Sequence, residues 1–478
     1  MPSTHPSDLF LRLLEPAFHR LSDGFSSLPT QNAQQNHDLA PILQLDTAAA
    51  AAVLEEAATR LADNYPYFHP LYAGQMLKPP HPVAQAAYAL AMSINPNNHA
   101  RDGGRASSEM EIEAVAELAA MFGWNQTNGG FLGHLTSSGT IANLEALWVA
   151  GQLAPDKRIL AQEQAHYTHQ RISAVLKLSF AKVAADAAGR MDLNALEDEL
   201  RKGDVGTVVV TMGTTALGTV DPLPEILTLR ERYGFRLHLD AAYGGYFRLL
   251  KDFAGPGALA PATAAAYAAM DQADSIVIDP HKHGLQPYGC GCVLFRDPSV
   301  GRFYKHDSPY TYFTSAELHL GEISLECSRA GAAAVALWTT QRLLPLTPDG
   351  DFAHGLAAGR AAALEFHARL ATDPRFIASA RPPDLDIVVW RVASSSPQSA
   401  SLRAQQIFDR CAELQLHLAL VQLPGAIFTT PSLLEKMAPP EDTPLTCLRS
   451  VLMKPEHAVW LDAIWDRLST AANSAAKE

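Results

Sequence analysis

The 478-residue sequence contains few cysteines and no long apolar run. Its five cysteines form no CxxC pair, and they are too few for a secreted disulfide framework or a cysteine-rich zinc site. The uncharged stretches 253–270 and 414–434 are broken by glycine, proline or polar residues, whereas a membrane-spanning helix needs roughly 20 mainly apolar residues. The N-terminus also lacks the basic and apolar segments of a signal peptide. We therefore expect a soluble, cytoplasmic protein with reduced thiols and no membrane partner.

Positive charge is also scarce. Lysine and arginine number 37 against 50 acidic residues, which gives a net charge of −13. A nucleic-acid-binding protein needs a basic face to contact phosphates, so the composition argues against nucleic acid as a partner. Hydrophobic residues make up 47% of the chain and charged residues 18%, which excludes disorder as the dominant state.

Short β-branched runs alternate with helical segments from about residue 130. This alternation predicts an α/β fold with a mostly parallel sheet. The expected strands are residues 158–161, 207–211, 236–240, 275–279 and 292–296. We expect three parts: an N-terminal helical segment that forms a dimer arm (1–105), a large α/β domain (106–345) and a small C-terminal α+β domain (346–478).

A hydroxyl-rich turn, Thr136-Ser137-Ser138-Gly139-Thr140, comes directly before the helical run IANLEALWVAGQL. The free N–H groups and the dipole of a helix start attract anions, so this turn is a candidate phosphate site. The alternative is an ordinary helix N-cap, because serine and threonine are common there.

Three further residues lie at or beyond the carboxyl ends of predicted strands. Ligands of open α/β sheets bind outside the carboxyl ends of strands, so these positions favour a common site. His166 can stack on a flat cofactor or move protons, although it can equally be a hydrogen-bonded loop histidine, and His169 is a weaker candidate for the same role. Asp240 can pair with a protonated ring nitrogen, or it can be a helix cap or an internal ion-pair residue. Lys282 can act as an amine nucleophile if burial lowers its pKa; the alternative is a surface lysine.

The combination of a phosphate turn, a stacking histidine, an aspartate for a ring nitrogen and a nucleophilic lysine is what pyridoxal phosphate requires. The order of these features resembles fold type I pyridoxal-phosphate enzymes. The segments TSSGTIANLEAL, EQAHYTH, HLDAAYGG and DPHKHGLQPYGCGCVLFRD resemble the group II amino-acid decarboxylases in particular. The resemblance covers roughly residues 65–455.

The resemblance implies a fold type I enzyme that binds pyridoxal 5'-phosphate in residues 106–345 and decarboxylates an L-amino acid. It also implies a homodimer with shared active sites. Lys282 would form the Schiff base with the cofactor, and Asp240 would pair with the pyridine nitrogen. The other implied cofactor contacts are His166 and Ala242 on the two ring faces, Ser138, Gly139, Thr140 and His281 at the phosphate, and Thr211 near the ring edge.

Some roles stay open at this point. Tyr310 is the preferred proton donor, but it can equally pack against the substrate or a neighbouring subunit. His283 stands where many relatives have an aromatic residue and can alter proton delivery or substrate fit. Arg329 and Arg449 are candidates for a substrate-carboxylate clamp, and each can equally be a structural ion-pair residue.

Other reactions are possible on the same scaffold: carbon–carbon lysis, aldehyde-forming oxidative deamination or transamination. A non-enzymatic nucleotide-binding or scaffolding protein is disfavoured, because the sequence contains neither GxGxxG nor GxxxxGKS/T.

Overall fold

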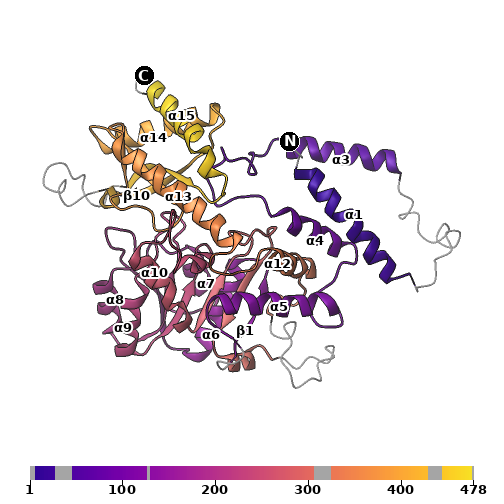
Figure 1. The fold of residues 1–478 in the computed structure, drawn as a ribbon. Helices are drawn as coiled ribbons and strands as arrows, with labels where there is room; N and C mark the ends of the chain where they lie inside the picture. Colours follow the sequence, from indigo (N-terminus) through magenta and orange to yellow (C-terminus); the bar gives the residue numbers. More distant parts are fainter. Residues whose placement is uncertain (1–5, 27–45, 126–129, 306–323, 429–443, 476–478) are drawn as a thin grey trace.

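Two sheets organise the chain in a computed structural model that describes residues 6–26, 46–125, 130–305, 324–428 and 444–475 (Figure 1). The strands of the larger sheet are β1 (Leu132–Thr136), β2 (Arg158–Gln162), β3 (Phe180–Val183), β4 (Val205–Thr211), β5 (Arg236–Asp240), β6 (Ser275–Ile278) and β7 (Gly291–Phe295). The strands of the smaller sheet are β8 (Phe376–Ala378), β9 (Ile387–Val392), β10 (Ala419–Pro424) and β11 (Pro444–Val451).

Helices surround both sheets. The α-helices are α1 (Pro6–Gly24), α3 (Thr47–Leu61), α4 (Pro82–Met92), α5 (Arg105–Met121), α6 (Gly139–Leu153), α7 (Thr168–Val175), α8 (Leu193–Leu200), α9 (Leu223–Tyr233), α10 (Pro261–Ala268), α12 (Gly331–Leu343), α13 (Asp351–Thr372), α14 (Pro397–Glu413) and α15 (His457–Ala475). Short 3-10 helices are η3 (Gly245–Leu250), η4 (Ala269–Gln272), η5 (Pro298–Phe303) and η6 (Gly425–Phe428). No described helix is both long and apolar enough to cross a bilayer.

The larger sheet has the strand order β1-β7-β6-β5-β4-β2-β3. The four pairs β3–β2, β2–β4, β4–β5 and β5–β6 are parallel. Strand β7 pairs antiparallel with both β1 and β6. The predicted α/β class with a mostly parallel sheet is confirmed. Two strands were not predicted, β1 at one edge of the sheet and β3 at the other.

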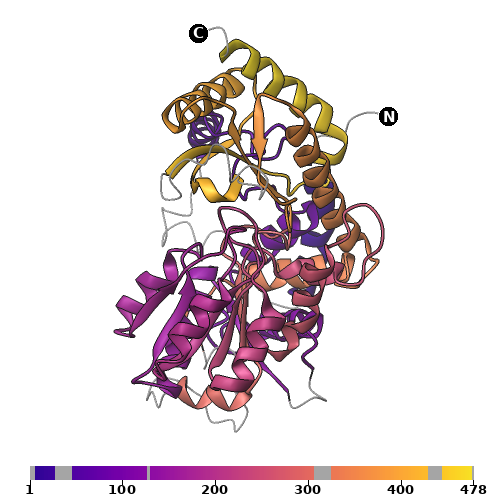
Figure 2. The same cartoon turned by 90° about the vertical axis from the view of Figure 1, so that its left-hand side faces the viewer.

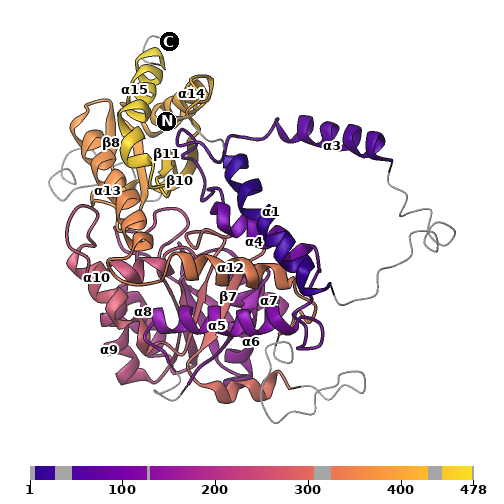
Figure 3. The same ribbon diagram turned by 45° about the vertical axis from the view of Figure 1, so that its right-hand side comes forward.

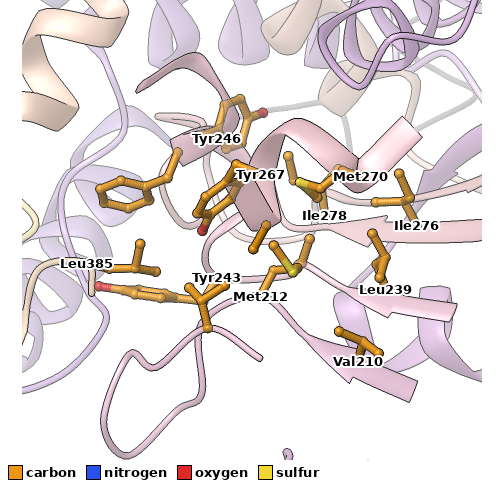
Figure 4. Packing of buried hydrophobic residues seen from close by; sticks show 14 of the residues in the cluster. Val210, Met212, Leu239, Tyr243, Tyr246, Tyr267, Met270, Ile276, Ile278 and Leu385 are labelled. Atoms are coloured by element: carbon orange, nitrogen blue, oxygen red, sulfur yellow. The ribbon is translucent and has the colours of Figure 1, made fainter. Parts of the chain in front are cut away.

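The core of the large sheet explains its apolar strands. Helix α6 packs on β6 and β7, and α5 packs on β1. Along β4, Val208 and Val210 belong to one buried apolar cluster and Val209 belongs to another, so both faces of this strand are covered. Strands covered on both faces need apolar side chains at consecutive positions, and Val208, Val209 and Val210 are all fully buried. Figure 4 shows the packing around Val210, Leu239 and Ile276, where β4, β5 and β6 lie side by side.

The smaller sheet is antiparallel, with the order β10-β11-β9-β8. Helices α13 and α14 pack on it, and α15 packs on both helices. In Figure 2 this α+β layer stands above the larger sheet. The sheets lie within 106–345 and 346–478, but the exact three-part division of the chain stays a prediction.

Helix α3 stands apart from the body of the molecule (Figure 3). Asp46 caps its N-terminus by accepting hydrogen bonds from the amides of Ala48 and Ala49. No residue of α3 is buried, although the helix carries apolar side chains. The helix therefore has nothing to pack against within the described part of its own chain.

Candidate active site

The carboxyl ends of five strands meet at one edge of the large sheet. Strands β2, β4, β5 and β6 are parallel, and β1 has the same direction because β7 is antiparallel to both β1 and β6. A cavity of about 180 Å³ opens at this edge. It is lined by Ser138, Gly139, Thr140, Asn143, His166, Thr168, Thr211, Gly213, Thr215, Asp240, Ala242, Tyr243, Asp279, His281 and Lys282.

This cavity brings together every predicted cofactor-site residue. The predicted lining residues are Ser138, Gly139, Thr140, His166, Thr211, Asp240, Ala242, His281 and Lys282. Tyr310 lies outside the described residues. Sequence reasoning located His166, Asp240 and Lys282 from predicted strand ends and the phosphate turn from a helix start, and the sheet topology brings these segments to one place.

The turn between β1 and α6 supplies one wall of the cavity. Ser138 caps α6, and its Oγ accepts a hydrogen bond from the amide of Ile141 at 3.4 Å. A Cβ atom at Gly139 would lie 2.6 Å from both carboxylate oxygens of Asp279, so a larger residue there would displace this carboxylate. Gly139 and Thr140 line the cavity in the first helical turn, where backbone N–H groups have no partner within the helix. This wall suits an anion.

His166 enters the cavity from the loop after β2. Its Nδ1 lies 2.7 Å from the Thr168 hydroxyl, which fixes the ring orientation. Burial lowers the pKa of His166, and the positive charge of Lys282 lowers it further, although Asp240 acts in the opposite direction. The ring is therefore held in its neutral form, which suits stacking on a flat partner.

Asp240 ends β5 with both carboxylate oxygens engaged. Oδ2 lies 2.8 Å from His169 Nε2, and Oδ1 accepts a hydrogen bond from the Ala242 amide at 3.2 Å. Burial alone would raise the pKa of Asp240, but the hydrogen bond with His169 and the nearby Lys282 ammonium outweigh it and hold the pKa well below its usual range. The carboxylate is therefore anionic, as a partner for a protonated ring nitrogen must be. His169, considered as an alternative stacking residue, does not line the cavity.

Lys282 lies beyond the end of β6 and is paired with Asp279. Its Nζ is 3.0 Å from Asp279 Oδ2. Burial lowers the pKa of Lys282, but Asp279 and Asp240 outweigh burial and raise the pKa above its ordinary value. The predicted lowering of this pKa is therefore wrong. The sequence-based expectation considered burial alone, whereas the negative charges of Asp279 and Asp240 favour the protonated amine.

Several polar atoms at the cavity lack partners, and this tests the fit of pyridoxal phosphate. Thr211 Oγ1, Asp279 Oδ1 and His281 Nδ1 are buried without a hydrogen-bond partner in the described structure. An amine, an anionic carboxylate, a neutral imidazole and an open helix start surround the same space. These groups match the aldehyde, ring nitrogen, ring face and phosphate of this cofactor. The described residues contain no cluster that could hold a metal ion.

His283 lies outside this cavity. It is buried, and its Nε2 lies 3.3 Å from Asp386 Oδ2. It lines a separate cavity of about 280 Å³ together with Lys78 and Lys454. The structure therefore gives no support for direct proton delivery by His283.

The two candidate arginines differ in their contacts. Arg329 donates hydrogen bonds to the Glu111 carboxylate and to the Leu135 carbonyl, which confirms its reading as a structural ion-pair residue. Arg449 has no carboxylate partner among the described residues. Its Nη2 donates to the carbonyl of Thr215, a residue that lines the cavity, at 2.7 Å.

Comparison with known proteins places this arrangement among its relatives. Residues 50–391 match the model of the pyridoxal-dependent decarboxylase conserved domain. An L-tyrosine decarboxylase of Enterococcus faecium is 29% identical, with 62% of this chain and 64% of that protein covered. An L-2,4-diaminobutyrate decarboxylase of Rhizobium meliloti is 30% identical, with 75% and 72% covered. The chain thus spans just under two thirds of the length of the tyrosine decarboxylase.

The fold has a counterpart among solved structures. The crystal structure of mouse CSAD superposes with a TM-score of 0.74 at 20% sequence identity, and the match covers 98% of this chain and 99% of that one. At this identity the likeness concerns the fold, whereas the family follows from the domain match over residues 50–391. The chain belongs to the family defined by the pyridoxal-dependent decarboxylase conserved domain.

Proposed function

We propose that this protein is a pyridoxal-phosphate-dependent decarboxylase that converts an L-amino acid to its amine and carbon dioxide. One observation supports the proposal above all: Lys282, Asp240 and His166 line one cavity together with the start of α6. The names of the two relatives reported above, both amino-acid decarboxylases, point the same way.

Each residue of the cavity is assigned to one part of the cofactor. When bound, pyridoxal phosphate supplies an aldehyde for amines and a protonated ring that accepts the electron pair left by the departing carboxylate. Lys282 provides the amine for the covalent link, and the anionic Asp240 keeps the ring nitrogen protonated. The remaining contacts are His166 and Ala242 at the ring faces, Thr211 at the ring edge, and Ser138, Gly139, Thr140 and His281 at the phosphate.

Two substrate-side roles belong to the same proposal. Arg449 is the better clamp for a substrate carboxylate, because Arg329 is already neutralised by Glu111. Tyr310 is the acid that returns a proton to Cα, since a phenol is mostly protonated at neutral pH.

A panel of L-amino acids tests the reaction. The protein loaded with pyridoxal phosphate is incubated with each amino acid, and carbon dioxide and amine are measured together. Equal amounts of both from at least one amino acid are expected. Aldehyde with ammonia, or a keto acid without carbon dioxide, would instead indicate the oxidative or transamination alternatives.

The ion pair at Lys282 predicts a pH effect. Asp279 raises the pKa of Lys282, so Asp279→Asn lowers it and leaves more free amine at neutral pH. The pH midpoint for covalent attachment of the cofactor should fall, because the close negative charge that favours the protonated amine is gone. Mixing cofactor-free protein with pyridoxal phosphate at several pH values, and following visible absorbance, measures this midpoint. An unchanged midpoint would show that Asp279 does not control the amine.

A homodimer in the cytoplasm is part of the proposal. On α3, Val53, Leu54 and Leu61 are 65%, 70% and 67% exposed, which is unusual for apolar side chains on one short helix. A second copy of the chain is the partner that would cover them, with α3 acting as the dimer arm.

Introducing negative charge into the apolar face of α3 tests the arm. The double variant Val53→Glu/Leu54→Glu should convert the dimer to a monomer, because it places carboxylates in an apolar interface. Light scattering after gel filtration gives the mass. Val459→Glu on α15 is the matched control, since Val459 is 83% exposed. A wild-type monomer, or a double variant that remains dimeric, would refute the arm.

A further inference from the structure

Asp240 lines the cavity and also contacts a histidine of α7. His169 is 1% exposed at its side chain and Asp240 is 7% exposed, so their 2.8 Å contact is shielded from water. His166 and His169 are joined by a backbone turn, in which the amide of His169 donates a hydrogen bond to the carbonyl of His166. As a result, His166 lines the cavity, whereas His169 reaches the Asp240 carboxylate without lining the cavity.

The surroundings of His169 fix how it bonds. Its Nδ1 is buried and has no hydrogen-bond partner among the described residues, so Nε2 is the atom that carries the shared proton. The neighbouring ring of His238 lies 6.5 Å away between centroids. His238 is itself held by Ser275 Oγ at 2.9 Å and Asn143 Oδ1 at 2.8 Å, and burial lowers its pKa to about 3. His238 is therefore neutral and does not compete for Asp240.

We propose that His169 is a positioning residue that donates its Nε2–H to Asp240, and so fixes the rotation and the negative charge of the carboxylate that faces the cofactor ring nitrogen. The proposal rests on the proposed function, because it assigns His169 to the same cofactor. A buried carboxylate that loses a hydrogen-bond donor binds a proton more readily. Without His169, Asp240 would then be a weaker partner for a protonated ring.

Replacing His169 with glutamine or with asparagine distinguishes a hydrogen-bonding role from a packing role, because the two side-chain amides differ in length. The side-chain nitrogen of glutamine reaches roughly as far as histidine Nε2, whereas that of asparagine reaches only as far as Nδ1. His169→Gln should therefore preserve the bond to Asp240, and His169→Asn should lose it. Ser173→Ala is the matched control, because Ser173 is a buried residue of the same helix whose hydroxyl has no partner in the described structure.

The readout is the ¹⁵N chemical shift of ring-labelled pyridoxal phosphate bound to each variant without substrate. Wild type, His169→Gln and Ser173→Ala should show a protonated ring nitrogen near pH 7, and His169→Asn should shift toward the unprotonated form. In a second readout, kcat should fall by about 10- to 100-fold in His169→Asn with little change in KM, as when outer partners of metal ligands are removed.

The outcomes separate the two proposals. If wild type binds no cofactor, the proposed function fails. If wild type binds cofactor with a protonated ring and His169→Asn shows the same shift and kcat, the positioning role fails while the function stands. Equal losses in His169→Gln and His169→Asn would also overturn the positioning role, because packing alone would then explain them.

Discussion

Replacing Lys282 with alanine should abolish turnover and remove the visible absorbance of covalently bound cofactor. Lys282 is the lysine that lines the cavity in the described structure, and its amine has no substitute there. Loss of an attacking residue typically costs several orders of magnitude, so we expect kcat to fall roughly 10³-fold or more. Turnover and an absorbance spectrum, recorded before and after borohydride, measure both effects.

Lys182→Ala is the control for this prediction, because Lys182 is exposed on β3 at the far edge of the same sheet. It should retain wild-type turnover and absorbance. A Lys282→Ala protein that kept a borohydride-sensitive absorbance and normal turnover would show that the cofactor binds at another lysine.

Asp240→Asn should retain the fold and lose most of the activity. The amide is nearly the same size as the carboxylate, but it carries no charge to hold a proton on the ring nitrogen. Removing an electrostatic partner of this kind costs about 10²- to 10³-fold in kcat. Circular dichroism monitors the fold while amine formation gives kcat.

Asp204→Asn is the matched control, since Asp204 pairs with Arg158 at 2.7 Å and lies away from the cavity. It should leave kcat unchanged. Unfolding of Asp240→Asn would contradict the expectation and indicate that the His169–Asp240 pair is mainly structural.

The sequence predicted the central strands well and the edges poorly. The strand at 236–240 was predicted with its observed bounds, because Leu237 and Leu239 alternate with polar residues soon after the helix that Gly234 caps. β1 was missed because Gly133 and His134 separate its two leucines; the cost of burying His134 is offset by Glu145 at 2.8 Å. β3 was missed because it is short and only partly buried.

The segments that line the cavity could be predicted, but the pairings of their side chains could not. His166, Asp240 and Lys282 lie at or just beyond the ends of strands that the sequence predicts, and the phosphate turn is visible as a helix start. The partners are visible only in three dimensions: His169 meets Asp240 across 71 positions, and Asp279 meets Lys282 because the turn between them folds back. Those carboxylates reversed the expected direction of the Lys282 pKa shift.

The covalent position of the cofactor tests the central claim most directly. The wild-type protein is loaded with pyridoxal phosphate, reduced with borohydride and digested, and the modified peptide is identified by mass spectrometry. The account predicts a single phosphopyridoxyl group, on the peptide that contains Lys282. Modification of a different lysine, or no modified peptide at all, would contradict it.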